Sequence, residues 1–130
     1  MQIEKVLLVD DDQNIRFVVQ MALEGLTNWK VLVAESGSEA LKIAEREKPD
    51  LILLDMMMPG MDGPTTYSQL KKQGSSVPVI FMTAKVQTHE VEDHLKLGAA
   101  GVIAKPFDPM TLHKDIMRIV DPLASGNAPG

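Results

Sequence analysis

The sequence predicts an α/β fold, with one parallel β-sheet covered by helices on both faces. Five short apolar runs recur along the 130 residues, and each is continuous rather than alternating, as in strands buried on both sides. The segments between the runs have the i, i+3, i+4, i+7 apolar spacing of amphipathic helices. Because strand-like and helix-like segments alternate five times, an open sheet with right-handed crossovers is favoured.

The first two strand–helix units carry clear helix start signals. The first predicted strand is Val6–Val9, and Asp12 is the expected N-cap of the helix that follows it. The second predicted strand is Val31–Ala34. Ser36 and Glu39 then form a capping box that opens the second helix.

The other three units follow the same alternation. Their predicted strands are Leu51–Leu54, Val79–Met82 and Val102–Ala104, each rich in Val, Ile or Leu or bounded by small residues. The last helix is expected to begin at Pro109 with Asp108 as its N-cap, since proline suits the first helical position.

Composition limits the classes of protein that this chain can represent. It is 45% apolar, which suits one domain over residues 1–123 followed by a flexible tail over residues 124–130. It has no run of about 18 apolar residues, no secretory leader and no cysteine, so we expect a cytoplasmic protein without membrane insertion, disulfides or thiolate metal sites. A net charge of −5 and only 4% aromatic residues argue against nucleic-acid binding.

Reactive side chains follow four of the five predicted strands at the point where each strand ends. Asp10 and Asp11 follow the first strand, Asp55 the third, Thr83 the fourth and Lys105 the fifth. The carboxyl ends of parallel strands meet at one edge of a sheet, where ligands bind in open α/β folds. We therefore expect these side chains to form one site.

The chemistry of this set points to phosphoryl transfer. Clustered carboxylates repel one another unless a cation neutralises them, and hard oxygen ligands suit Mg²⁺. A carboxylate beside Mg²⁺ can attack a phosphoryl group, because the metal offsets the charge repulsion. A lysine and a threonine hydroxyl would attract the phosphoryl oxygens, and the small Ala84 after the threonine leaves room for the group to enter.

Four motifs resemble those of the receiver domain of two-component response regulators. They are LLVDDD (Leu7–Asp12), LLDMMMPGMDG (Leu53–Gly63), FMTA (Phe81–Ala84) and GAAGVIAKPF (Gly98–Phe107). Their order and spacing are similar to that family over residues 4–121. The resemblance implies a three-layer, flavodoxin-like (βα)5 fold with strand order 2-1-3-4-5.

The same resemblance implies which residues hold the metal and accept the phosphoryl group. Asp55 would be the phosphoacceptor and, with Asp10, Asp11 and the backbone carbonyl of Met57, a ligand of Mg²⁺. The acidic pair is assigned to Asp10 and Asp11 because they close the strand and stand six and five residues before Arg16.

The remaining implied roles concern the bound phosphoryl group. Thr83 would be the switch hydroxyl, Ala84 would line the entry and Lys105 would contact the phosphoryl oxygens. The Lys105–Pro106 peptide bond is expected to be cis.

Two positions depart from the family's pattern. Val102 stands where members often carry a Tyr or Phe ring that turns inward on activation. Met57 and Lys85 occupy the positions that commonly tune hydrolytic water, and neither can easily act as a base. We therefore expect a long-lived acyl phosphate and a switch without an aromatic rotamer change.

Three histidines and one polar segment complete the predictions. His89, His94 and His113 fall on predicted helices away from the carboxylates and are interpreted as solvated. The segment Lys85–Leu97 is expected to be mobile, because Val91 is the only apolar residue between residues 88 and 93.

The leading hypothesis is a stand-alone response regulator that takes its phosphoryl group from a histidine kinase or phosphotransfer protein. It would be no enzyme toward other substrates, but would catalyse its own phosphorylation and dephosphorylation. It would signal through the face of its fourth helix, fifth strand and fifth helix, as a monomer or a weak phosphorylation-dependent dimer.

One alternative is a small Mg²⁺-dependent phosphohydrolase of the haloacid-dehalogenase kind, suggested by the Asp-x-Asp spacing of Asp10 and Asp12. The other is a receiver-like scaffold that is not phosphorylated.

Overall fold

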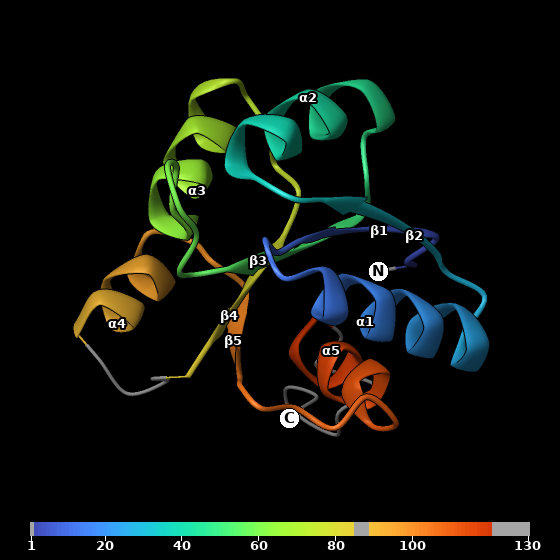
Figure 1. The fold of residues 1–130 in the computed structure, drawn as a ribbon. Helices are drawn as coiled ribbons and strands as arrows, with labels where there is room; N and C mark the ends of the chain where they lie inside the picture. Colours follow the sequence, from blue (N-terminus) through green and yellow to red (C-terminus); the bar gives the residue numbers. More distant parts are fainter. Residues whose placement is uncertain (1, 85–88, 121–130) are drawn as a thin grey trace, which may run out of the picture.

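The fold was examined in a computed structural model, which describes residues 2–84 and 89–120. Five strands form one parallel sheet in the order β2-β1-β3-β4-β5, and helices cover both of its faces (Figure 1). The predicted fold class and the strand order that the resemblance implied are both confirmed.

Each strand is one residue longer than the apolar run that predicted it. The strands are β1 (Lys5–Val9), β2 (Lys30–Ala34), β3 (Leu51–Asp55), β4 (Val79–Thr83) and β5 (Gly101–Ala104). The helices are α1 (Gln13–Leu26), α2 (Gly37–Glu47), α3 (Gly63–Lys72), α4 (His89–Lys96) and α5 (Leu112–Val120).

Two apolar cores explain why the strand sequences are continuous rather than alternating. In β1, Leu7 and Val9 belong to the core beneath α2, α3 and α4, whereas Val6 and Leu8 belong to the core beneath α1 and α5. Successive side chains of a strand point to opposite faces, and here both faces are covered. The result is a three-layer arrangement (Figure 1).

The predicted starts of α1 and α2 are confirmed by their hydrogen bonds. A carboxylate oxygen of Asp12 accepts from the backbone N–H groups of Asn14 and Ile15 at 2.8 and 3.3 Å. The hydroxyl of Ser36 accepts from the N–H of Glu39 at 3.2 Å. Both side chains satisfy donors that the first turn of a helix leaves without intrahelical partners.

The predicted start of α5 at Pro109 is wrong, because the helix begins at Leu112. Asp108 does accept a backbone hydrogen bond, from Met110 at 2.9 Å, but it does so in a turn. The N–H of Thr111 donates to the Asp108 carbonyl at 3.1 Å. This bond spans three residues, as in a β-turn, whereas an α-helical bond spans four. A polar cap signal therefore marked a turn that precedes the helix.

The expectation that all three histidines are solvated holds only for His89, whose side chain is fully exposed. His94 packs against Phe81 and Tyr67, with ring centroids 5.3 and 6.2 Å apart. The Nδ1 atoms of His94 and His113 are both buried. Helical spacing in the sequence correctly predicted that these residues lie on helices. The aromatic rings that face His94 come from distant segments, which local spacing does not reveal.

Two predictions fall outside the described residues: the role of Lys85 in the 85–88 segment, and the flexible tail over residues 124–130. Within the described part of the 85–97 segment, Val91 is buried in the core. None of the described helices has the length and apolar content that crossing a membrane requires.

Candidate functional site

Three carboxylates converge at the carboxyl ends of the neighbouring strands β1 and β3. Asp10 and Asp11 follow β1 directly, and Asp55 is the last residue of β3. The two strands are neighbours, with Val9 paired to Leu54. The three side chains each offer an oxygen within 4.8 Å of the others. The predicted acidic cluster is therefore present in the structure.

The members of this cluster differ in exposure. Asp10 is fully buried and Asp55 is 5% exposed, whereas Asp11 is exposed. Backbone donors hold the two buried groups: the N–H of Asp12 lies 2.9 Å from Oδ1 of Asp10, and that of Met57 lies 3.5 Å from Oδ1 of Asp55. Asp11 thus faces solvent at the mouth of a buried acidic pair.

Lys105 joins the cluster from the edge of the sheet. Its ammonium lies 2.9 Å from Oδ2 of Asp10 and 3.2 Å from Oδ1 of Asp55. Its backbone N–H donates to the Thr83 carbonyl at 2.9 Å, and the Lys105–Pro106 peptide bond is cis. The ammonium therefore bridges carboxylates that are supplied by two other strands.

The electrostatics of the site follow from burial and from this bridge. Burial raises the pKa of the Asp55 carboxyl, and the neighbouring Asp10 carboxylate raises it further, while Lys105 opposes both. For Lys105, burial lowers the pKa, but Asp10 and Asp55 together more than offset it, so the pKa lies above its ordinary value. The ammonium stays charged, and the Asp55 carboxylate is a stronger base than an exposed aspartate.

Thr83 and Ala84 lie beside the strand that ends in Asp55. Thr83 ends β4, which pairs with β3 so that Met82 lies opposite Asp55. Thr83 is buried, whereas Ala84 is exposed. The structure thus places the Thr83 hydroxyl one residue beyond Met82, the residue that pairs with Asp55, and it is followed by a small residue at the surface.

The loop after Asp55 is folded tightly against the start of α3. The N–H of Gly63 donates to the Met56 carbonyl at 3.0 Å, and a Cβ at Gly63 would collide with the Asp55 carbonyl. The side chain of Met57 projects from this loop and is 79% exposed. No role was predicted for Gly63 from the sequence, although its place at the end of the LLDMMMPGMDG motif was the available signal.

Arg16, like Gly63, contacts the site although the sequence motifs gave it no role there. Its guanidinium donates to the backbone carbonyl of Asp10 at 2.8 Å and lies 4.0 Å from Glu35. Arg16 therefore fixes the backbone that carries the buried carboxylate. Glu35, the residue directly after β2, is the exposed carboxylate that faces this arginine.

The donor set fits a hard divalent cation. Asp10, Asp11 and Asp55 supply only oxygen atoms, and the exposed Asp11 leaves one side open to water. Mg²⁺ prefers such ligands and usually keeps several water molecules. These carboxylates are the residues that would hold it.

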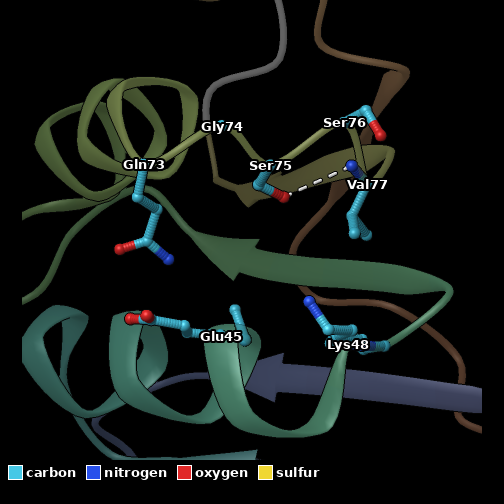
Figure 2. Close-up of a pocket in the computed structure, with 9 residues that line it drawn as sticks. Glu45, Lys48, Gln73, Gly74, Ser75, Ser76 and Val77 are labelled. Atoms are coloured by element: carbon cyan, nitrogen blue, oxygen red, sulfur yellow. Dashed lines mark hydrogen bonds between the residues drawn. The ribbon is translucent and has the colours of Figure 1, made fainter.

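A separate hollow of about 300 Å³ lies between α2 and the segment that joins α3 to β4 (Figure 2). It adjoins the residues that precede β3 and β4, so it lies at the opposite edge of the sheet from the carboxylates. Glu45, Lys48 and Gln73, which line it, are exposed. We assign this hollow no role.

Comparisons with known proteins agree with this geometry. Residues 6–117 match the family model described as the response regulator receiver domain. The chain is 39% identical over 117 residues to the alkaline phosphatase synthesis transcriptional regulatory protein PhoP of Bacillus subtilis (strain 168), covering 90% of this chain and 48% of that protein. It is 38% identical over 105 residues to sporulation initiation phosphotransferase F of the same organism, covering 81% of this chain and 84% of that protein.

A solved structure shows the same likeness. The chemotaxis response regulator CheY4 of Vibrio cholerae superposes with a TM-score of 0.82 at 31% identity, covering 92% of this chain and all of that one. The chain spans about half the length of the first curated relatives it matches.

Proposed function

Since the chain belongs to the response regulator receiver domain family, it is a phosphoacceptor domain, and we propose that Asp55 is its acceptor. The phosphoryl group would come from a histidine kinase or a histidine phosphotransfer protein. Phosphorylation would then switch a protein-interaction surface.

One observation carries the choice of Asp55 over Asp10. Both oxygens of Asp10 are engaged, one by the Asp12 N–H and the other by the Lys105 ammonium. Both contacts on Asp55 reach Oδ1, so within the described residues its Oδ2 accepts no hydrogen bond. Asp55 therefore has an oxygen available for attack, and Asp10 does not.

The proposed step is an in-line transfer. An oxygen of Asp55 attacks the phosphorus, the bond from phosphorus to the donor nitrogen or oxygen breaks, and the leaving group takes the electron pair and a proton. Mg²⁺, held by Asp10, Asp11, Asp55 and the Met57 carbonyl, would offset the repulsion between the carboxylate and the phosphoryl oxygens. Water attack on the same phosphorus later releases phosphate and restores the carboxylate.

The residues around Asp55 would respond to the new charge. An acyl phosphate brings about −1.5 to −2 charges by analogy with other phosphorylated side chains. Lys105 would move from the carboxylates to a phosphoryl oxygen, and the Thr83 hydroxyl would turn toward another, past the small Ala84. Because the Lys105 contact is stronger with the phosphoryl group present, it can shift the conformational equilibrium.

An apolar surface beside Lys105 is suited to contact with a partner protein. An apolar hollow of about 400 Å³ adjoins Lys105 and lies between α1 and the segment that joins β5 to α5, lined among others by Ile15, Val18 and Phe107. This hollow supports contact with a phosphodonor protein beside the proposed acceptor, Asp55.

We propose that the output partner binds the α4–β5–α5 face and that the domain spans residues 1–123. We propose further that it acts in the cytoplasm as a monomer or weak phosphorylation-dependent dimer, without binding nucleic acid.

The alternatives are less well supported. The family match disfavours a haloacid-dehalogenase-like phosphohydrolase, whose nucleophile would follow the first strand. An unphosphorylated scaffold has no use for a buried acidic pair in which burial, and then the Asp10 carboxylate, raise the pKa of Asp55.

Intact-mass spectrometry after incubation with a small phosphodonor tests the proposal. We expect one phosphoryl group on the parent chain with Mg²⁺ and none with a chelator. Asp55→Ala should gain none, whereas Asp12→Ala, which alters an exposed helix cap, should still be modified. Equal incorporation into Asp55→Ala and the parent would refute the assignment.

A further inference from the structure

His94 lies where α3, β4 and α4 meet, in surroundings unlike those of the other histidine on its helix. Its ring centroid is 5.3 Å from that of Phe81 on β4 and 6.2 Å from that of Tyr67 on α3. Tyr67 and Phe81 also contact each other edge to face at 5.5 Å. His89, five residues earlier on α4, is fully exposed. We call the three rings of Tyr67, Phe81 and His94 the α4 cluster.

The α4 cluster is one of the attachments of α4 to the rest of the chain. Val91 is the apolar residue of α4 that enters the core. The Tyr67 hydroxyl donates to the Leu97 carbonyl, just past the end of the helix, at 3.3 Å. With Leu95 and Lys96 exposed, α4 depends on few attachments, of which the His94 ring is one.

The buried nitrogen of His94 makes this attachment sensitive to protons. Nδ1 is buried and, among the described residues, has no hydrogen-bond partner. A neutral imidazole can leave this nitrogen unprotonated, but an imidazolium must place an N–H donor there. A buried donor without an acceptor is costly, and the added charge makes it more so. Release of the ring to solvent would give the N–H donor a water partner and would hydrate the charge.

The surrounding charges do not offset this cost. On α3, the Tyr67 hydroxyl donates to the Leu97 carbonyl, and the Lys71 ammonium lies 5.3 Å from the centroid of the Tyr67 ring. Phe81 brings no titratable group from β4. On α4, Asp93 and Lys96 are exposed, and no described carboxylate forms an ion pair with His94. Glu90 stands four residues earlier in the sequence.

We propose that His94 is a proton-sensitive latch on α4: in the neutral state it holds the helix on the sheet, and proton uptake weakens that hold. Phe81 shares a face of β4 with Thr83, two residues on, so the latch adjoins the strand that leads to the acceptor site. It would give α4 a second input besides phosphorylation. The latch goes beyond the phosphoacceptor role and does not require it.

Hydrogen exchange of the α4 amides between about pH 7.5 and pH 5.5, corrected for intrinsic rates, tests the latch. In the parent chain we expect the opening of α4 to increase as the pH falls, by at most about tenfold per pH unit, the limit for one linked proton. The matched variants are His89→Ala, which should behave as the parent, and His94→Leu, which should lose the pH dependence. Asp55→Ala should keep it, which separates the latch from phosphate acceptance.

Three results would overturn the proposal. They are pH-independent protection of α4 in the parent, an unchanged pH dependence in His94→Leu, and loss of that dependence in Glu90→Gln. If His94→Leu does not fold, NMR of the parent decides the question. The ring signals of His94 and the α4 amide signals should then titrate with one midpoint, and separate midpoints would contradict the latch.

Discussion

At the scale of single residues, Asp55 occupies an environment that opposes its own charge. Burial and the Asp10 carboxylate raise its pKa, and the Lys105 bridge offsets this only in part. The fold therefore binds a proton at Asp55 more tightly than the unfolded chain does. Above the raised pKa the ionised carboxylate destabilises the fold, and this penalty disappears as the pH falls through that pKa.

Asp55→Asn should therefore raise the melting temperature at neutral pH in the presence of a chelator. The gain should shrink as the pH is lowered through the raised pKa of Asp55 toward its ordinary value. Thermal unfolding across pH measures this. Asp12→Asn is the control, because asparagine caps a helix about as well as aspartate and little change is expected. A lower melting temperature for Asp55→Asn at neutral pH would contradict the proposed repulsion.

Lys105→Ala should destabilise the metal-free protein by about 2 kcal/mol, because it leaves the buried Asp10 carboxylate without its charged donor. Mg²⁺ should recover part of the loss. Urea unfolding with chelator and with Mg²⁺ checks both statements. Arg118→Ala, which breaks an exposed pair with Asp115, should cost less than about 1 kcal/mol. Equal losses for the two variants would mean that Lys105 does not neutralise the cluster.

Met57→Asn should shorten the lifetime of the acyl phosphate several-fold, because an amide can orient a water molecule that the exposed thioether cannot. Loss of the phosphorylated mass over time measures the lifetime. Met110→Asn, an exposed methionine on the α5 side, should leave it unchanged. An unaltered lifetime in Met57→Asn would show that this side chain does not control hydrolysis.

The residue scale also shows where sequence reasoning stops. The reactive residues could be predicted because each follows a strand directly, and strand ends are visible in the sequence. The contacts of Arg16 with Asp10 and Glu35 could not be, since they depend on the distance between β1 and β2 at their ends. The partial burial of His94 depends in the same way on rings from β4 and α3.

At the scale of elements, the loop between β3 and α3 lies in close backbone contact with Asp55. Gly63 is the first residue of α3, and a Cβ at this position would meet the Asp55 carbonyl oxygen and the Met56 α-carbon. The strands were predicted to within one residue, because burial on both faces leaves a continuous apolar run. The start of α5 was misplaced, because an Asp-Pro signal serves turns as well as helix caps.

Gly63→Ala should destabilise the fold by about 2 kcal/mol, because the added methyl group has to displace backbone rather than a flexible side chain. The variant should also accept phosphate more slowly, since the displaced backbone belongs to Asp55. Gly25→Ala on α1 is the matched control. No atom lies within 4 Å of its added Cβ, so it should stabilise the helix by about 0.5–1 kcal/mol. A neutral Gly63→Ala would mean that the loop yields easily.

At the scale of the whole molecule, two cores position one site. The core beneath α2, α3 and α4 and the core beneath α1 and α5 hold the sheet between them, so that the ends of β1, β3 and β5 are fixed relative to one another. Asp10, Asp55 and Lys105 meet only because of that arrangement, although Lys105 is 95 residues from Asp10. Sequence could predict that they share an edge, but the engaged oxygens of Asp10 and the available oxygen of Asp55 required the structure.

The central claim is that this arrangement makes Asp55 the nucleophile. The most direct measurement is to phosphorylate the chain with a small donor and Mg²⁺, reduce the acyl phosphate with borohydride, and locate the modified aspartate by peptide mass mapping. The account predicts modification at Asp55 alone, with none when Mg²⁺ is chelated. Modification at Asp10, whose two oxygens are both engaged here, would contradict it.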